Sequence, residues 1–177
     1  LAFQNEEKEK RAAELYLANK ELIANKDINI AATIFESQVG MLVTDAKNNI
    51  LRVNSAFTTI TGYTKEEAVG QKPSLLKSNR QNKEFYAEMW ECINQTGEWS
   101  GEIWNKNKNG NVYPEYLTIK AVKDANGIIT NYVATLIDIT LNKAASDKIM
   151  RLAFYDPLTK LPNRRLLLDR LNQAVAA

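Results

Sequence analysis

The side chains that most enzymes use for proton transfer and covalent catalysis are scarce in this chain. Its 177 residues include no histidine and a single cysteine, Cys92. Without histidine, the chain lacks the commonest general base, the usual haem ligand and a ligand of most zinc sites. The sequence also contains no glycine-rich phosphate loop, no nucleophile paired with a base and no carboxylate pair in a local catalytic motif. We therefore expect no catalytic residues, no metal site and no haem, and a binding role rather than an enzyme activity.

Composition places the chain among ordinary globular proteins. It is 45% hydrophobic and 25% charged, and its length suits one domain with flanking elements. One cysteine excludes an internal disulfide and fits a reducing compartment. No apolar run reaches the roughly 20 residues of a membrane helix and no signal peptide is recognisable, so we expect a soluble, cytoplasmic fragment without membrane contact, whose parent could be anchored upstream. The net charge of +2 is scattered, with few aromatic residues among the basic ones, which does not indicate nucleic-acid binding.

Two helical segments are expected at the ends of the chain. Residues 1–30 contain no glycine or proline, and Leu1, Leu15 and Leu22 are separated by multiples of seven. This pattern predicts a charged helix with a thin coiled-coil seam, although a single solvated helix remains an alternative. Residues 141–155 return to helical periodicity and end at Asp156-Pro157, because the residue before proline disfavours helical geometry.

The segment between these helices has a mixed pattern. Two short β-prone runs at 41–46 and 50–54 are followed by short helices, one of them with a capping box at Thr64 and Glu67, by a longer helix at 82–95 and by three β runs. The three β runs, 99–105, 112–122 and 128–139, are separated by Asn-Gly pairs that favour hairpins. Alternation along the middle run places Tyr113, Leu117 and Ile119 on one, dry face. We expect an α+β domain in which a five-stranded antiparallel sheet and helices on one face enclose an apolar cavity.

Several short motifs in this segment resemble those of the PAS sensor family. In chain order they are Asn54-Ser55-Ala56-Phe57, Thr61-Gly62-Tyr63, Gly70, Trp99-Ser100-Gly101-Glu102, Asn109-Gly110 and Asp138-Ile139-Thr140. The resemblance implies a PAS domain at 31–140 between an N-terminal signalling helix at 1–30 and a linker helix at 141–155. It also implies a relay at Asp138, Ile139 and Thr140, where the last strand leads into the output helix.

A second resemblance begins at Asp156. The run Asp156-Pro157-Leu158-Thr159-Lys160-Leu161-Pro162-Asn163-Arg164-Arg165 is similar to the opening of a GGDEF, or diguanylate cyclase, domain. Residues 156–177 would then be the truncated start of a domain that makes or degrades cyclic-di-GMP in the parent protein. By this resemblance Asn163 would contact guanine in a complete domain. Asn172 departs from the acidic residue of many active cyclases, which puts cyclase activity of the parent in doubt.

The candidate ligand of the cavity is FAD. Met89-Trp90, Trp99-Ser100-Gly101 and Asn105 resemble the FAD-binding PAS domains of the bacterial aerotaxis receptor and the nitrogen-fixation redox regulator. The resemblance implies that Asn54, Trp99 and Asn105 contact FAD with Trp90 nearby.

Lys77 and Arg80, on an adjacent loop, could reach the pyrophosphate of FAD. The alternatives are an empty cavity or an unknown small molecule, because the tryptophan and asparagine also serve as core residues in other PAS domains. Residues 70–74 contain no thiol, which argues against cysteine-adduct photochemistry.

The sequence thus leaves three functions in competition. The leading hypothesis is a sensory module that dimerises through its flanking helices and passes a ligand or redox signal to a cyclic-di-GMP domain. The second is a ligand-free dimerisation or spacer module of the same protein. The third, an enzyme in its own right, has no supporting motif.

Overall fold

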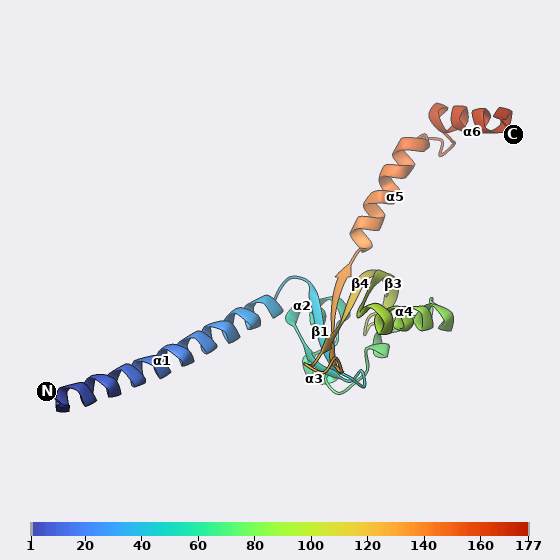
Figure 1. Cartoon of the computed structure of the whole chain (residues 1–177). Helices are drawn as coiled ribbons and strands as arrows, with labels where there is room; N and C mark the ends of the chain where they lie inside the picture. The colour runs from blue at the N-terminus through green and yellow to red at the C-terminus, as the bar shows by residue number, and fades with distance from the viewer. Residues whose placement is uncertain (1, 177) are drawn as a thin grey trace.

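One five-stranded antiparallel sheet forms the centre of the molecule (Figure 1). The computed structural model describes residues 2–176, except for the side chains at 2–10, 12–13, 24, 27 and 175–176. The order of strands is β2-β1-β5-β4-β3, so the first and last strands of the chain lie side by side in the middle. The strands are β1 Gly40–Asp45, β2 Ile50–Val53, β3 Glu98–Lys106, β4 Val112–Lys123 and β5 Ile129–Asp138.

Four short elements between β2 and β3 pack on the sheet. They are α2 Ser55–Thr61, α3 Lys65–Ala68, the 3-10 helix η1 Pro73–Leu76 and α4 Lys83–Thr96. The predicted α+β arrangement is therefore confirmed. Each strand lies within a residue or two of its expected range, because the Asn-Gly pairs do mark the hairpins, with Gly110 and Gly127 at positive φ.

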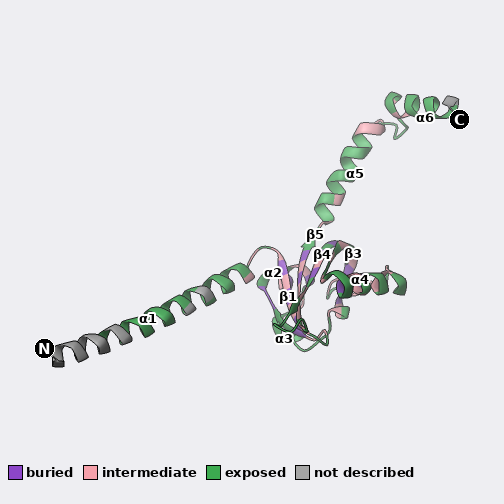
Figure 2. Ribbon diagram, in the orientation of Figure 1, coloured by how far each residue is buried: buried purple, intermediate pink, exposed green. Residues whose placement is uncertain are grey.

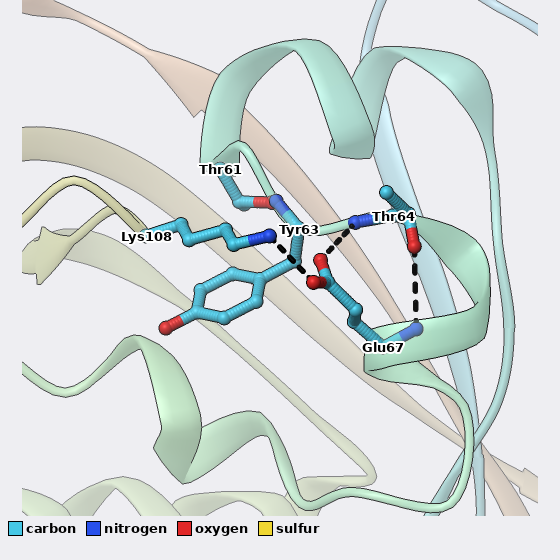
Figure 3. Close-up of polar contacts among 5 residues, drawn as sticks. All are labelled: Thr61, Tyr63, Thr64, Glu67 and Lys108. Atoms are coloured by element: carbon cyan, nitrogen blue, oxygen red, sulfur yellow. Dashed lines mark hydrogen bonds and ion pairs between the residues drawn. The ribbon is translucent and has the colours of Figure 1, made fainter.

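Local signals in the sequence fix the ends of the short helices. Gly62 ends α2 with a φ of 77°, and Asn82 caps α4 by accepting from the Phe85 amide. Thr64 and Glu67 form the capping box predicted for α3, shown in Figure 3. Glu67 also pairs with Lys108 of the β3–β4 turn, so the segment after Thr61-Gly62-Tyr63 ties the short helices to that hairpin (Figure 3).

The core fills the space between the sheet and these helices. Phe57 of α2, Ile93 of α4 and Ile50 of β2 are completely buried. Leu136 of β5 is 1% exposed. On β4, the expected alternation holds: Tyr113, Leu117 and Ile119 all face inward. The central domain therefore has a hydrophobic core of its own.

Three helices lie outside this core. Helix α1 spans Ala2–Phe35, α5 spans Thr140–Phe154 and α6 spans Arg164–Ala176. Figure 2 shows α5 and the part of α1 whose burial is described leaving the domain with mostly exposed surfaces. Helix α1 continues five residues beyond the predicted end at residue 30, because the sequence has no glycine or proline before Gly40.

Of the heptad leucines in α1, Leu15 and Leu22 are exposed, whereas Leu1 is outside the described residues. In the part of the chain that the structure describes, no helix is both long and apolar enough to cross a bilayer.

Candidate ligand-binding cavity

A cavity of about 280 Å³ opens between the inner face of the sheet and the helices. Most of its wall is apolar, contributed by β1, β4, β5 and α4. Polar groups gather where β3 and β4 run side by side. The lining residues are Leu42, Thr44, Asn48, Pro73, Ser74, Leu76, Lys77, Tyr86, Met89, Trp90, Ile103, Asn105, Glu115, Leu117, Ile119, Tyr132, Ala134 and Leu136. A mainly apolar hollow with a few convergent polar groups is the usual form of a small-molecule site.

Glu115 is the most unusual member of this lining. Its side chain is completely buried, near the start of β4. Asn105 Nδ2 donates to one carboxylate oxygen at 3.2 Å, and the Tyr113 hydroxyl donates to the other at 3.0 Å. A carboxylate can accept about four hydrogen bonds, so each oxygen retains capacity for a further donor.

Burial and neighbouring charge set the protonation of this carboxyl. Desolvation raises the pKa of Glu115 to about 7, against the hydrogen bonds from Tyr113 and Asn105 that lower it. Asp138, which lies opposite Glu115 in the β4–β5 register, raises the pKa further. Burial, helped by Glu115, likewise raises the pKa of Tyr113, so the phenol stays a donor. Glu115 therefore changes charge near neutral pH.

Two further polar groups belong to the same cavity. The Tyr86 hydroxyl is buried and has no hydrogen-bond partner among the described residues. Lys77 places its ammonium 4.5 Å from the centre of the Tyr86 ring. Buried hydroxyls in folded proteins are usually paired, so the unpartnered Tyr86 oxygen is available to a ligand or a water molecule.

Three of the six predicted cofactor contacts line this cavity: Lys77, Trp90 and Asn105. The Trp90 ring meets Tyr132 edge to face at 5.4 Å and closes the wall between α4 and β5. Asn105 is 6% exposed and donates a hydrogen bond to Glu115. An isolated antiparallel β-bridge joins the backbones of Lys77 and Asn105. These three side chains come from different elements, which the sheet and α4 bring together.

Trp99 does not line the cavity. It lies on the same side of β3 as Asn105, but the two are six steps apart along the strand, or roughly 20 Å. Its ring packs edge to face on Phe85 at 5.9 Å and lies over Gly101, where a Cβ atom would come within 2.7 Å of the ring. The Trp-x-Gly motif therefore serves packing at the far end of the strand.

Asn54 also lies outside the lining, and its amide is fully used. Nδ2 donates to the carbonyls of Phe35 and Val39 at 2.8 and 2.7 Å, and Oδ1 accepts from the amides of Met41 and Phe57. The residue caps α2 and joins the end of α1 to the sheet. The structure gives Asn54 a structural position rather than a place beside the predicted ligand.

Arg80 is exposed and stacks its guanidinium 4.0 Å over the Trp104 ring. Trp104 points to the opposite side of β3 from Asn105, because consecutive side chains alternate along a strand.

The only cysteine, Cys92, lies on α4 and is not part of the lining. Among the described residues no cluster of histidine, cysteine or acidic side chains could hold a metal ion.

The predicted relay residues form a compact start to α5. Asp138 Oδ1 accepts from the Thr140 amide at 2.8 Å and from the Thr140 hydroxyl. The Thr140 hydroxyl thus bonds a side chain, the Asp138 carboxylate. Ile139 occupies the cap position, and its amide donates to the Pro114 carbonyl of β4 at 3.1 Å. The first turn of α5 is therefore fastened to the residue that precedes Glu115.

Sequence reasoning missed Glu115, although a signal was present. The alternation that places residues 113, 117 and 119 on the dry face of β4 also places residue 115 there, because its period is two. A charged residue on a dry face is rarely buried unless it has partners or a function.

Two known proteins are similar in sequence to part of this chain. The nitrogen fixation regulatory protein of Klebsiella oxytoca is 31% identical over 114 residues, which are 64% of this chain and 23% of that protein. The aerotaxis receptor of Escherichia coli K12 is 33% identical over 73 residues, 41% of this chain and 14% of the receptor.

Among solved structures, a light-oxygen-voltage domain from a flavin-analogue study superposes with a TM-score of 0.58. It has 19% identity and covers 68% of this chain and 91% of that domain. The chain spans under a quarter of the length of these two relatives. The PAS domain family matches residues 38–141, more than half of the chain. This chain belongs to the PAS domain family.

Proposed function

We propose that this PAS domain is a sensor that binds FAD, with the isoalloxazine ring in the cavity between the sheet and α4. The observation that carries the proposal is the mixed lining of that cavity, with Trp90 and aliphatic side chains at one end and Asn105 and Glu115 at the other. Resemblance to the nitrogen fixation regulator and to a light-oxygen-voltage domain studied with a flavin analogue supports the choice of ligand.

The residues present suit a flavin ring. The cavity of about 280 Å³ is slightly below the usual roughly 300–1,000 Å³ of ligand sites, so it suits the ring and not the whole dinucleotide. Trp90 and Met89 offer an apolar wall, and Asn105 offers an amide to a polar ring edge. Lys77 is the lining cation available to a phosphate. Bound FAD would supply a redox-active chromophore.

The test is the visible spectrum of the purified protein, recorded as isolated and after addition of FAD followed by desalting. We expect retained flavin absorbance at about one FAD per chain. Protein that is colourless in both preparations would contradict the proposal and favour the ligand-free spacer function.

The relay is proposed to run from Glu115 to α5. Glu115 and Asp138 are direct cross-strand partners, and the next residue, Ile139, bonds the Pro114 carbonyl. A change at the cavity end of β4 can therefore alter the hydrogen bonds that start α5.

Amide hydrogen exchange of FAD-loaded protein, oxidised and then reduced with dithionite, tests this relay. We expect a changed exchange rate at Thr140–Lys143 that Asp138→Asn removes. Asp124→Asn is the matched control, because Asp124 accepts backbone hydrogen bonds in the same way at the β4–β5 turn. A wild-type response confined to the cavity strands would contradict the relay.

We propose further that α5 leads into a cyclic-di-GMP domain of the parent protein. The run from Asp156 to Arg165 supports this by its similarity to the opening of GGDEF domains. In this chain Asp156 accepts from the Leu158 and Thr159 amides, and Asn163 accepts from Leu166 at the start of α6. The chain itself is proposed not to be an enzyme. Incubation with GTP and magnesium should yield no cyclic-di-GMP, and its formation would contradict this assignment.

A homodimer through the flanking helices completes the proposal. Leu15 and Leu22 on α1 are 70% and 65% exposed, and α5 exposes Ile149 and Leu152. In a single chain these side chains are in contact with water, whereas the same helices of a second copy would cover them. Light scattering should show a dimer that the double variant Leu15→Glu, Leu22→Glu dissociates and that Glu14→Gln, Glu21→Gln does not. A wild-type monomer at every concentration would contradict it.

A further inference from the structure

The polar end of the cavity contains more hydrogen-bonding capacity than the protein itself uses. The Glu115 carboxylate receives one hydrogen bond on each oxygen, both from donors held in place by the sheet. Asn105 has a second amide N–H, and the Tyr86 hydroxyl has no partner among the described residues. These groups face the same hollow. The lining therefore offers one strong acceptor, Glu115, and two donors, Asn105 and Tyr86.

We propose that Glu115 is the specificity-determining acceptor of the cavity and takes the N–H of a cyclic imide, with Asn105 and Tyr86 donating to the carbonyl groups on either side of that N–H. An imide edge carries one donor between two acceptors, and the lining offers one acceptor and two donors to match them. The inference rests on the proposed flavin function, because the isoalloxazine ring carries such an imide. It deepens that function by assigning the recognition of the ring edge to Glu115.

Placement favours an acceptor role for Glu115. Both of its protein partners, Tyr113 and Asn105, act as donors, so the surrounding hydrogen bonds are arranged for an ionised carboxylate. The remaining titratable or charged groups near it are Asp138 across the strand pair and Lys77 at the cavity wall. Burial opposes ionisation, and a ligand donor would offset that cost by supplying a further hydrogen bond.

This arrangement links flavin affinity to pH. Ionised Glu115 accepts the imide N–H, so affinity is highest above the Glu115 pKa of about 7 and falls as the pH drops through it. Between pH 8 and pH 6 the dissociation constant should rise roughly tenfold. The chain has no histidine to titrate in this interval.

The experiment compares riboflavin with 3-methylriboflavin, which lacks the imide N–H, by quenching of flavin fluorescence. A hydrogen bond to a charged group predicts that wild-type protein prefers riboflavin by about tenfold or more. Glu115→Leu should reduce this preference to about one. Glu115→Gln keeps an acceptor oxygen and the side-chain shape, so it should keep a smaller preference and lose the pH dependence. Glu98→Gln, an exposed carboxylate change on β3, should behave as wild type.

The outcomes separate the inference from the function beneath it. Wild-type protein that binds both flavins equally, with no change between pH 6 and 8, would overturn the role of Glu115 and leave flavin binding intact. Wild-type protein that binds neither flavin would overturn the proposed function together with the inference. If Glu115→Leu does not fold, as judged by circular dichroism, the wild-type preference and the Glu115→Gln pH profile still decide the matter.

Discussion

The central domain and its flanking helices obtain their stability in different ways. Phe57 and Ile93 in the domain are completely buried, whereas Leu22 of α1 and Leu141 of α5 are 65% and 83% exposed. Helix α1 has 34 residues, and its last residue, Phe35, and the following Glu36 accept hydrogen bonds from Asn54 and Ser55 of the domain. The domain has a hydrophobic core of its own. The exposed apolar side chains of the helices would be covered only in the proposed homodimer.

The largest effect should come from emptying the core. Phe57→Ala removes a completely buried ring and should lower the free energy of unfolding by about 3–5 kcal/mol. Leu22→Ala, at an exposed position of α1, should leave the unfolding of the central domain unchanged. Urea denaturation followed by tryptophan fluorescence measures both. Equal losses in the two variants would show that α1 and the domain unfold as one unit.

The next effect concerns the polar end of the cavity and depends on pH. The pKa of Glu115 is 4.5 when unperturbed and about 7 in the folded protein, so between these values the folded state keeps a proton that the unfolded state releases. The free energy of unfolding should therefore fall as pH rises from 4.5 to 7, by about 3 kcal/mol in total, and level off above.

The measurement for this effect is urea denaturation without flavin at several pH values, with wild type compared with Glu115→Gln and with Glu98→Gln as control. The carboxyl groups of Glu36, Asp45, Glu67 and Asp156 have lowered pKa values. Their contributions to the free energy of unfolding therefore change below about pH 4.5. Between pH 4.5 and 7 the change comes from Glu115. A wild-type profile as flat as that of Glu115→Gln would contradict the assignment.

A smaller effect is expected at the junction between the two regions. Asn54→Ala leaves the amides of Met41 and Phe57 and two carbonyls without their partner, and should cost about 2 kcal/mol. Asn82→Ala removes a cap with a single exposed hydrogen bond and should cost about 1 kcal/mol. Thermal unfolding compares the two. If Asn54→Ala instead removed bound flavin without a loss of stability, the original assignment of Asn54 to the ligand would be restored.

The smallest effect belongs to the exposed ion pair between Lys143 of α5 and Glu102 of β3. Both side chains are partly exposed, at 39% and 54%, so Lys143→Ala should change the free energy of unfolding by at most about 1 kcal/mol. A larger loss would mean that α5 is held to the sheet by more than its first turn.

The residues explain which features the sequence could predict. Gly62, the Thr64–Glu67 capping box and the Asn-Gly turns act through local geometry, so the short helices and hairpins followed from their spacing. Burial along β4 followed from alternation.

The position of Trp99 did not follow, because strand parity gives the face of a residue but not which end of the sheet faces the cavity. Asn54 was assigned by a motif, whereas its position depends on the end of α1, 19 residues away. The burial of Glu115 could have been predicted only by applying the alternation of β4 to a charged residue.

Flavin binding in this particular cavity is the central claim, and a site-directed FAD titration tests it most directly. Ala134 lines the cavity and is 5% exposed, so the phenyl ring of Ala134→Phe would occupy the space proposed for the isoalloxazine ring. Ala87→Phe adds a phenyl ring at an exposed position of α4 instead. We predict one FAD per chain for wild type and Ala87→Phe, and none for folded Ala134→Phe. Wild-type protein without bound flavin, or Ala134→Phe that binds FAD as wild type does, would contradict the account.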